Sequence, residues 1–154
     1  MRIIGGKNKG KKLNIPIDEN TRPLRDMVKE SIFNLIEHSK KFKITISNSN
    51  ILDLFSGTGS FGLECFSRGA QNITFVEEYD KILKILKKNI SSINAIESCK
   101  IIEKNCFDYF ESENKFQDKF DIIFLDPPYR EKKINLLINK INQEKILTNN
   151  GVII

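Results

Sequence analysis

The pattern of apolar and polar positions changes once along the chain, close to residue 50. From Ile51 onward, short apolar runs alternate with stretches in which apolar residues recur every three or four positions. Runs of the first kind predict buried strands, and stretches of the second kind predict amphipathic helices. Strands are expected at 51–55, 72–77, 99–105, 120–126 and from 151 onward. Helices are expected between them at 59–69, 80–93 and 132–144, with a short helical turn at 106–111.

Strands separated by helices of this length are typical of a parallel sheet with right-handed crossover connections. We therefore predict an α/β fold with a Rossmann-like, mostly parallel and doubly wound sheet. Residues 1–16 follow another pattern, since they are basic and punctuated by glycine, and they predict a small hairpin or arm. Residues 1–43 are expected to form a small basic N-terminal extension on a core of residues 44–154.

One amphipathic helix is expected within this extension, after a turn at Arg22-Pro23. Apolar residues recur there at helical spacing up to His38, which would close the helix at the surface. We expect the buried face of the helix to consist of Val28, Ile32, Leu35 and Ile36.

Charge is distributed unevenly between the two parts. The chain has 154 residues and a net charge of +5. Residues 1–43 hold 11 Lys and Arg against 5 Asp and Glu, whereas residues 44–154 hold 14 against 15. A basic segment on a nearly neutral core suggests an anionic partner such as nucleic acid, although a solvated, lysine-rich surface would give the same count.

The rest of the composition is that of an ordinary globular chain. No apolar run approaches the roughly 20 residues of a membrane-spanning helix, and no apolar segment typical of a signal peptide follows the first charges. Cys65, Cys99 and Cys106 show no metal-ligand spacing. We therefore expect a cytoplasmic protein that binds neither a membrane nor a metal.

The first chemical signal is a glycine-rich turn after the strand at 51–55. Gly57, Gly59 and Gly62 satisfy the G-x-G-x-x-G pattern, and Glu77 follows 20 positions after Gly57, at the end of the next strand. Glycines permit a tight turn and close ligand approach, and an acid at that place accepts hydrogen bonds from ribose hydroxyls. An NAD-dependent oxidoreductase fits this pattern, as does a tight turn that binds nothing.

Asp53, four residues before Gly57, changes this interpretation. A carboxylate beside the loop would repel the pyrophosphate of a dinucleotide but attract a cationic ligand. S-adenosylmethionine carries a positive sulfonium and an ammonium, has no phosphate and offers a ribose to Glu77. The sequence therefore favours S-adenosylmethionine over NAD.

The second chemical signal is the DPPY segment that begins at Asp126. Each proline fixes its own backbone and extends the residue before it, and neither has an N–H group. The Asp126 carboxylate and the Pro127 carbonyl can accept both hydrogens of a planar amino group, while Tyr129 offers a ring for base stacking. This suits methylation of an exocyclic amine on a nucleobase that has left its stack. A rigid turn at the end of a core strand is the alternative.

Four segments, at 1–13, 21–36, 51–70 and 120–129, resemble the bacterial RsmD family, which methylates N2 of a guanine in 16S ribosomal RNA of the small ribosomal subunit. The resemblance spans nearly the whole chain and implies a class I S-adenosylmethionine-dependent methyltransferase. The DPPY segment alone is also similar to the motif of DNA adenine-N6 methyltransferases, whereas the first two segments are much more specific to the ribosomal RNA family. The basic extension alone is compatible with a non-catalytic RNA-binding module.

The resemblance also implies roles for individual residues. The S-adenosylmethionine site would consist of Asp53, Gly57 and Gly59, Glu77 at the ribose, and Asn105 and Cys106 beside the adenine. The catalytic residues would be Asp126, Pro127 and Tyr129. Contacts to RNA would come from Pro128, Lys7, Lys9, Lys11 and Lys12. Arg22 and Arg25 would contact either the RNA or the methionine end of the cofactor.

The usual target of the family is guanine 966, in 16S ribosomal RNA or in an assembly intermediate of the small subunit. We expect the enzyme to be a monomer. Members of the family continue for several tens of residues beyond the position where this chain ends, through a closing pair of antiparallel strands. We therefore expect the C-terminal edge strands of the sheet to be missing here.

Overall fold

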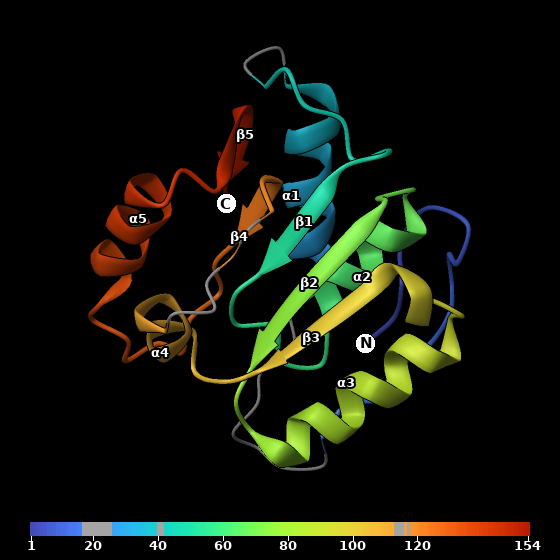
Figure 1. The fold of residues 1–154 in the computed structure, drawn as a ribbon. Helices are drawn as coiled ribbons and strands as arrows, with labels where there is room; N and C mark the ends of the chain where they lie inside the picture. The colour runs from blue at the N-terminus through green and yellow to red at the C-terminus, as the bar shows by residue number, and fades with distance from the viewer. Residues whose placement is uncertain (17–25, 40–41, 113–115, 117) are drawn as a thin grey trace.

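The structure is a computed structural model that describes residues 1–16, 26–39, 42–112, 116 and 118–154. In these residues five strands form one sheet in the order β3-β2-β1-β4-β5, and every pair of neighbours runs parallel. The strands are β1 Asn50–Asp53, β2 Asn72–Glu77, β3 Cys99–Glu103, β4 Phe120–Phe124 and β5 Leu147–Ile153. The predicted α/β fold with a doubly wound parallel sheet is confirmed (Figure 1).

Helices stand between the strands as the sequence predicts. They are α1 Asp26–His38, α2 Ser60–Ser67, α3 Asp80–Ser92, α4 Cys106–Glu111 and α5 Ile134–Gln143, with a short 3-10 turn η1 at Ile96–Ser98. The largest difference from the prediction is β5, which begins at Leu147 rather than at Gly151, because its first residues are too polar to form an apolar run. Within the described residues, no helix combines the length and apolar character that crossing a bilayer would require.

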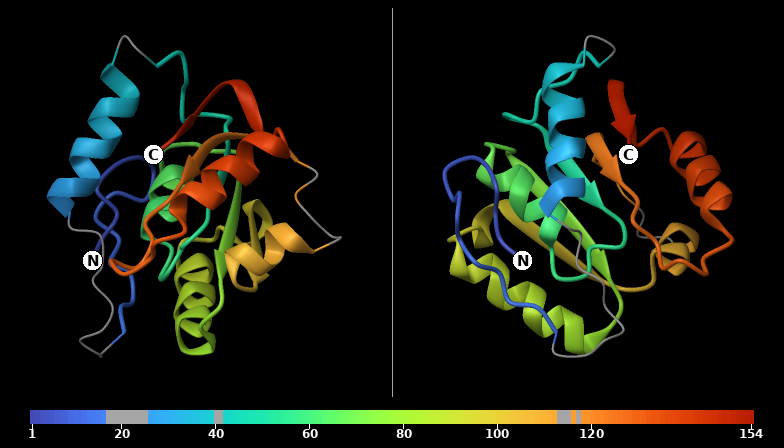
Figure 2. Two further views of the ribbon diagram at one scale, coloured as in Figure 1. Left: turned by 90° about the vertical axis from the view of Figure 1, so that its left-hand side faces the viewer. Right: turned by 180° about the vertical axis from the view of Figure 1, so that it is seen from behind.

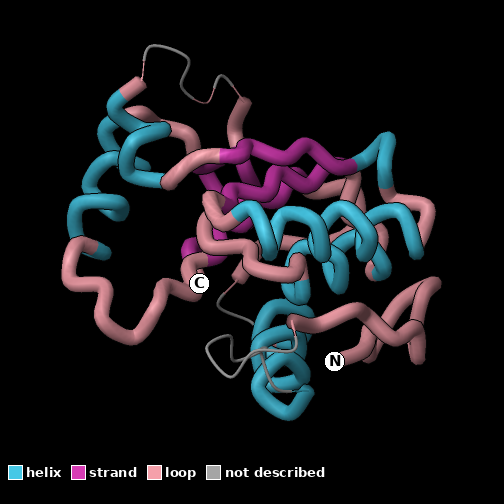
Figure 3. The backbone as a smooth tube through the Cα atoms, turned by 90° about the horizontal axis from the view of Figure 1, so that it is seen from below, coloured by secondary structure: helices cyan, strands magenta, loops and turns pink. Residues whose placement is uncertain are grey.

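Side chains from each strand point to alternate faces of the sheet and so build two cores. Ile51 of β1 packs with the N-terminal residues and with α1, α2 and α3, whereas its neighbour Leu52 packs with α4 and α5. Figure 2 shows this layering, with α1 and the N-terminal segment on one side of the sheet and α4 and α5 on the other. In Figure 3 the strands likewise lie between helices.

The N-terminal residues form the predicted hairpin and lie against α2. Arg2 and Lys12 make an antiparallel bridge, and the Ile3 N–H donates to the carbonyl of Lys11 at 2.9 Å. Gly6 has a φ of 71°, and a Cβ at this position would come within 1.8 Å of the Ser67 carbonyl oxygen. Glycine at this position therefore allows the hairpin to approach the end of α2 closely.

The inward face of α1 differs from the prediction. Its buried residues are Lys29, Phe33 and Ile36, whereas Val28 and Leu35 are 46% and 54% exposed. The prediction was therefore wrong for Val28 and Leu35. An apolar pattern cannot identify the inward face of this helix, because the charged Lys29 is one of the residues on it.

A buried carboxylate on α2 explains the burial of Lys29. Glu64 accepts hydrogen bonds from the backbone N–H groups of Ile4 at 2.8 Å and Gly5 at 2.7 Å. It also forms ion pairs with Lys29 at 3.3 Å and Arg68 at 3.0 Å. The side chains of Glu64 and Lys29 are both 0% exposed. Glu64 therefore attaches both the hairpin and α1 to α2.

Candidate functional site

A cavity of about 900 Å³ opens at the carboxyl ends of the strands. The arrowheads of β1, β2, β3 and β4 point to this same edge of the sheet (Figure 1). The chain winds from β1 outward through β2 and β3 and returns on the other side of β1 through β4 and β5. Ligands of open α/β sheets bind at the point where the strand order reverses, so this cavity is the candidate site.

The glycine loop forms one wall of the cavity. Gly57 lines it, has a φ of 52° and donates its N–H to Glu77 Oε2 at 2.8 Å. Gly59, with a φ of 84°, faces α3 instead, and a Cβ there would come within 2.6 Å of Leu86 Cδ1. Gly57 thus shapes the cavity directly, whereas Gly59 allows the loop to pack on α3.

Glu77 closes the end of β2 and is held by backbone groups. Its Oε1 accepts hydrogen bonds from the N–H groups of Glu78 and Tyr79, both at 3.0 Å. Its Oε2 accepts only the Gly57 N–H among the described residues. Because a carboxylate oxygen can accept two hydrogen bonds, Oε2 can accept another from a ligand in the cavity.

Asp53 is the most unusual group in the site. It is 1% exposed and lines the cavity. Its Oδ2 accepts a long hydrogen bond of 3.3 Å from the Gly62 N–H, and its Oδ1 has no partner among the described residues. Burial raises the pKa of Asp53 to about 8, and the nearby carboxylates of Asp126 and Glu77 add to the rise. A cationic ligand next to Asp53 would stabilise the ionised form of this buried carboxyl group.

This pKa predicts how stability changes with pH when the cavity is empty. Because the pKa of Asp53 is raised from 3.8 to about 8, the folded chain retains a proton that the unfolded chain releases, and stability falls as pH rises between these values. Asp53→Asn removes this titration. We expect its melting temperature, relative to that of the wild type, to be at least about 3 °C higher at pH 9 than at pH 5. A melting-temperature difference that is the same at both pH values would contradict this.

Asn105 and Cys106 lie at the start of α4, on the cavity wall. Asn105 caps the helix, since its Oδ1 accepts the Phe107 N–H at 2.9 Å, and its Nδ2 donates to Glu78 at 3.1 Å. Burial raises the pKa of Cys106 to about 12. Its thiol therefore stays protonated at neutral pH and acts as a wall of the cavity rather than as a nucleophile.

The DPPY segment forms another part of the cavity wall. Asp126, Pro127, Pro128 and Tyr129 all line the cavity. No described residue donates a hydrogen bond to the Asp126 carboxylate or to the Pro127 carbonyl, so both acceptors are available to a ligand. Partial enclosure raises the pKa of Asp126. Tyr129 is fully exposed at the mouth of the cavity.

The structure does not bring the basic residues of the hairpin into the cavity. Lys7, Lys9, Lys11 and Lys12 are exposed, and Lys7 Nζ lies 3.8 Å from the centroid of the Phe66 ring. Arg22 and Arg25 lie outside the described residues. The hairpin lysines therefore form a surface separate from the cavity, and Lys7 lies at the C-terminal end of α2.

The structure adds residues that the sequence patterns did not identify. The rings of Phe55 and Phe107 pack edge to face on the cavity wall, with their centroids 6.3 Å apart. Five carboxylates line the cavity, whereas Lys104 is the one basic residue among the described residues that line it. These carboxylates belong to Asp53, Glu77, Glu78, Asp126 and Glu131. Such a cavity repels phosphate groups, which argues against a dinucleotide.

No set of three or more potential ligand side chains (His, Cys, Asp or Glu) in the described part of the chain is arranged to hold a metal ion.

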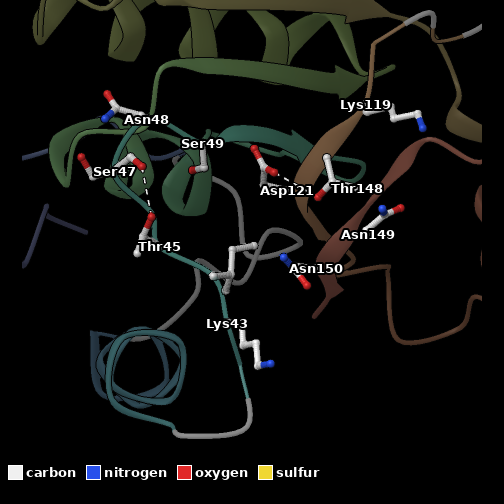
Figure 4. A pocket seen from close by; sticks show the side chains of 11 residues that line it. Lys43, Thr45, Ser47, Asn48, Ser49, Lys119, Asp121, Thr148, Asn149 and Asn150 are labelled. Carbon is white, nitrogen blue, oxygen red and sulfur yellow. Dashed lines mark hydrogen bonds between the residues drawn. The ribbon is translucent and has the colours of Figure 1, made fainter.

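A second cavity, of about 520 Å³, lies at the opposite end of β1 and β4 (Figure 4). Its acidic residue, Asp121, accepts hydrogen bonds from the Asn50 N–H at 2.8 Å and from the Thr148 hydroxyl at 3.0 Å. None of the predicted site residues lines this cavity. The carboxylate of Asp121 is already used in hydrogen bonds that join neighbouring parts of the sheet.

Comparison with known proteins gives a consistent result. The chain matches the family described as conserved hypothetical protein 95 over residues 1–154. It is 33% identical over 154 residues to "Putative rRNA methyltransferase YlbH" of Bacillus subtilis, a match that covers 100% of this chain and 80% of the relative. It is 36% identical over 142 residues to "Ribosomal RNA small subunit methyltransferase D" of Haemophilus influenzae, which covers 89% of this chain and 70% of the relative.

A solved structure supports the same relationship. "Putative methyltransferase yhhF" from Escherichia coli superposes with a TM-score of 0.76 at 28% sequence identity. The superposition covers 100% of this chain and 75% of the other. The sequence match and the fold match therefore extend over the cavity as well as over the sheet.

Proposed function

Since this chain belongs to the conserved hypothetical protein 95 family, which is the RsmD family of ribosomal RNA methyltransferases, we propose that it methylates N2 of a guanine in small-subunit ribosomal RNA. The observation that carries the proposal is the pair of available acceptors, Asp126 and Pro127, which line the same cavity as the buried Asp53. S-adenosylmethionine is the proposed methyl donor.

The cavity fits this donor on chemical grounds. The unpartnered Oδ1 of Asp53 and the surrounding carboxylates suit a ligand with a sulfonium and an ammonium and without phosphate. Glu77 can accept a hydrogen bond from a ribose hydroxyl through Oε2, and Asn105 and Cys106 would flank the adenine. When bound, the donor supplies an electrophilic methyl group. The residues of this chain hold it in place and screen it from water.

The acceptor site would bind the exocyclic amine of the base. That nitrogen is a poor nucleophile because its lone pair is delocalised into the ring. Hydrogen bonds from its two hydrogens to the Asp126 carboxylate and the Pro127 carbonyl favour the geometry in which the lone pair is localised and aimed at the methyl group. The exposed ring of Tyr129 would stack on the base, and Pro128 would contact its edge.

RNA would reach the cavity across the hairpin. Lys7, Lys9, Lys11 and Lys12 are exposed on the hairpin, where they would contact phosphates, and Arg22 and Arg25 are proposed to assist them. Affinity should then fall steeply with salt concentration. Guanine 966 of 16S ribosomal RNA, within an assembling small subunit, is the proposed target by family membership.

The proposed role of Asp53 makes a further prediction. A cation in the cavity would favour the ionised form of Asp53. Asp53→Asn cannot supply that charge, so S-adenosylmethionine should bind roughly ten- to a hundredfold more weakly, as expected for the loss of a hydrogen bond to a charged group. Calorimetric titration would measure the change. NAD, titrated alongside, should bind neither protein, and tight binding of NAD to the wild type would support an oxidoreductase.

The proposal is tested by the choice of methyl acceptor. Purified protein and labelled S-adenosylmethionine are incubated with small ribosomal subunits that lack the modification, with naked small-subunit RNA and with duplex DNA. We expect label in ribosomal RNA and none in DNA. Label in DNA alone would identify a DNA adenine methyltransferase, which shares the DPPY motif, and would reject the proposal.

A further inference from the structure

One buried side chain joins the N-terminal hairpin to the glycine loop. Asn89 lies on α3, and none of its surface is exposed. Buried amide groups are stable only when their hydrogen-bonding atoms are paired. The partners of Asn89 therefore show which parts of the chain it holds together.

On one side, Asn89 holds the segment that leaves the hairpin. Its Oδ1 accepts hydrogen bonds from the backbone N–H of Asn14 at 2.7 Å and from the Asn14 side-chain amide at 2.9 Å. Its Nδ2 donates to the Asn14 carbonyl at 3.0 Å. Pro16, two residues further along, lines the cavity. These bonds therefore fix the place where the chain passes from the hairpin to the rim of the cavity.

On the other side, Asn89 holds the glycine loop. Its Nδ2 also donates to the carbonyl of Thr58 at 2.9 Å, and Thr58 lines the cavity. One turn earlier on α3, Leu86 packs against Gly59. The face of α3 that carries Leu86 and Asn89 therefore supports the loop beneath the candidate site.

These four hydrogen bonds use both donors and both acceptor lone pairs of the amide. Asn89 therefore cannot move with Asn14 without straining or breaking its bond to Thr58. A second link runs in parallel, since Met1 Sδ lies 3.8 Å from the Thr58 hydroxyl. The hairpin and the cavity loop are thus joined through contacts that both sides share.

From this arrangement we infer that Asn89 is a positioning residue that couples RNA on the hairpin to the affinity of the cavity for its cofactor. The inference rests on the proposed function. RNA that holds the hairpin in place would also hold Asn14, Asn89 and Thr58 in place, so the loop would lose less freedom when the cofactor binds. Coupling of this kind is reciprocal, so a bound cofactor would tighten the binding of RNA by the same factor.

The test uses S-adenosylhomocysteine, which binds without turnover, titrated with and without saturating naked small-subunit RNA. For the wild type we expect RNA to raise the affinity at least about fivefold, the lower end of typical coupling. Asn14→Pro removes both donors of Asn14 but leaves the Asn89–Thr58 bond. It should keep the RNA-free affinity within about twofold and lose most of the gain from RNA. Asn89→Leu should lose the gain and also bind the cofactor about tenfold more weakly without RNA.

Asn72→Leu is the matched control, because it breaks an Asn–Asn hydrogen bond of 2.9 Å between Asn72 and Asn50 at the far end of the sheet and should behave as the wild type. Asn14→Ala, which removes only the side-chain donor, replaces the proline variant if that variant folds poorly. An equal gain from RNA in the wild type and the Asn14 variants would overturn the inference, as would no gain in the wild type. If the wild type binds no S-adenosylhomocysteine at all, the proposed function itself fails and the inference fails with it.

Discussion

Replacing Asp126 by alanine is expected to reduce methyl transfer to ribosomal RNA about a thousandfold, the effect of removing one well-placed polar group from a transition state. Asp126 lines the cavity, and no described residue donates a hydrogen bond to its carboxylate. Without it, the amine loses one of its two fixed acceptors. Single-turnover rates with saturating RNA and S-adenosylmethionine would measure the loss.

Binding of RNA should survive this substitution, because the exposed lysines of the hairpin lie on a separate surface. Asp108→Ala is a suitable control, since Asp108 is exposed on α4 and does not line the cavity, so its removal changes net charge equally. An Asp126→Ala protein with the methyl transfer rate of the wild type would show that the DPPY segment is only a turn. If neither the wild type nor the Asp126→Ala protein transfers methyl groups, yet both bind RNA, the chain is a non-catalytic RNA-binding module.

Replacing Glu64 by leucine is expected to lower the free energy of unfolding by about 3–5 kcal/mol, as for the loss of one partner from a buried ion pair. The change leaves Lys29 buried without its carboxylate and removes the acceptor of the Ile4 and Gly5 N–H groups. A loss of this size is a large part of the stability of an ordinary domain. Urea unfolding at neutral pH would measure it.

The double variant Lys29→Met with Glu64→Leu distinguishes the cost of an unpaired buried charge from the cost of altered packing. A buried ion pair replaced by apolar side chains of similar volume is often neutral or stabilising. The double variant should therefore recover much of the loss, although the hairpin N–H groups remain unpaired. If both variants were equally unstable, the contribution of Glu64 would come from its bonds to the hairpin N–H groups and to Arg68 rather than from Lys29.

The strands and the site could be predicted from sequence because both depend on local pattern. Short apolar runs identify β1 to β4, and residues that directly follow a strand must lie at its carboxyl end. Asp53, Glu77 and Asp126 were therefore expected at one edge of the sheet, and the structure places all three on one cavity. The chemical roles of these residues stay proposals.

What the sequence did not predict depends on long-range pairing. Lys29 is buried because it pairs with Glu64, 35 residues further along the chain, and with the Arg2 carbonyl, and no local pattern contains that information. Asn89 reads as a polar residue near the end of an amphipathic helix, yet its partners lie 75 and 31 residues away. The beginning of β5 was missed for another reason, since its pairing with Phe120 starts at Leu147, ahead of three polar residues.

The central claim is that this chain methylates N2 of a guanine in small-subunit ribosomal RNA, and the identity of the modified nucleoside tests it most directly. Small subunits that lack the modification are incubated with the protein and labelled S-adenosylmethionine, and their RNA is digested to nucleosides and analysed by mass spectrometry. The account predicts label in N2-methylguanosine, and none when the Asp126→Ala protein is used. Label in any other nucleoside, or equal labelling by the variant, would contradict it.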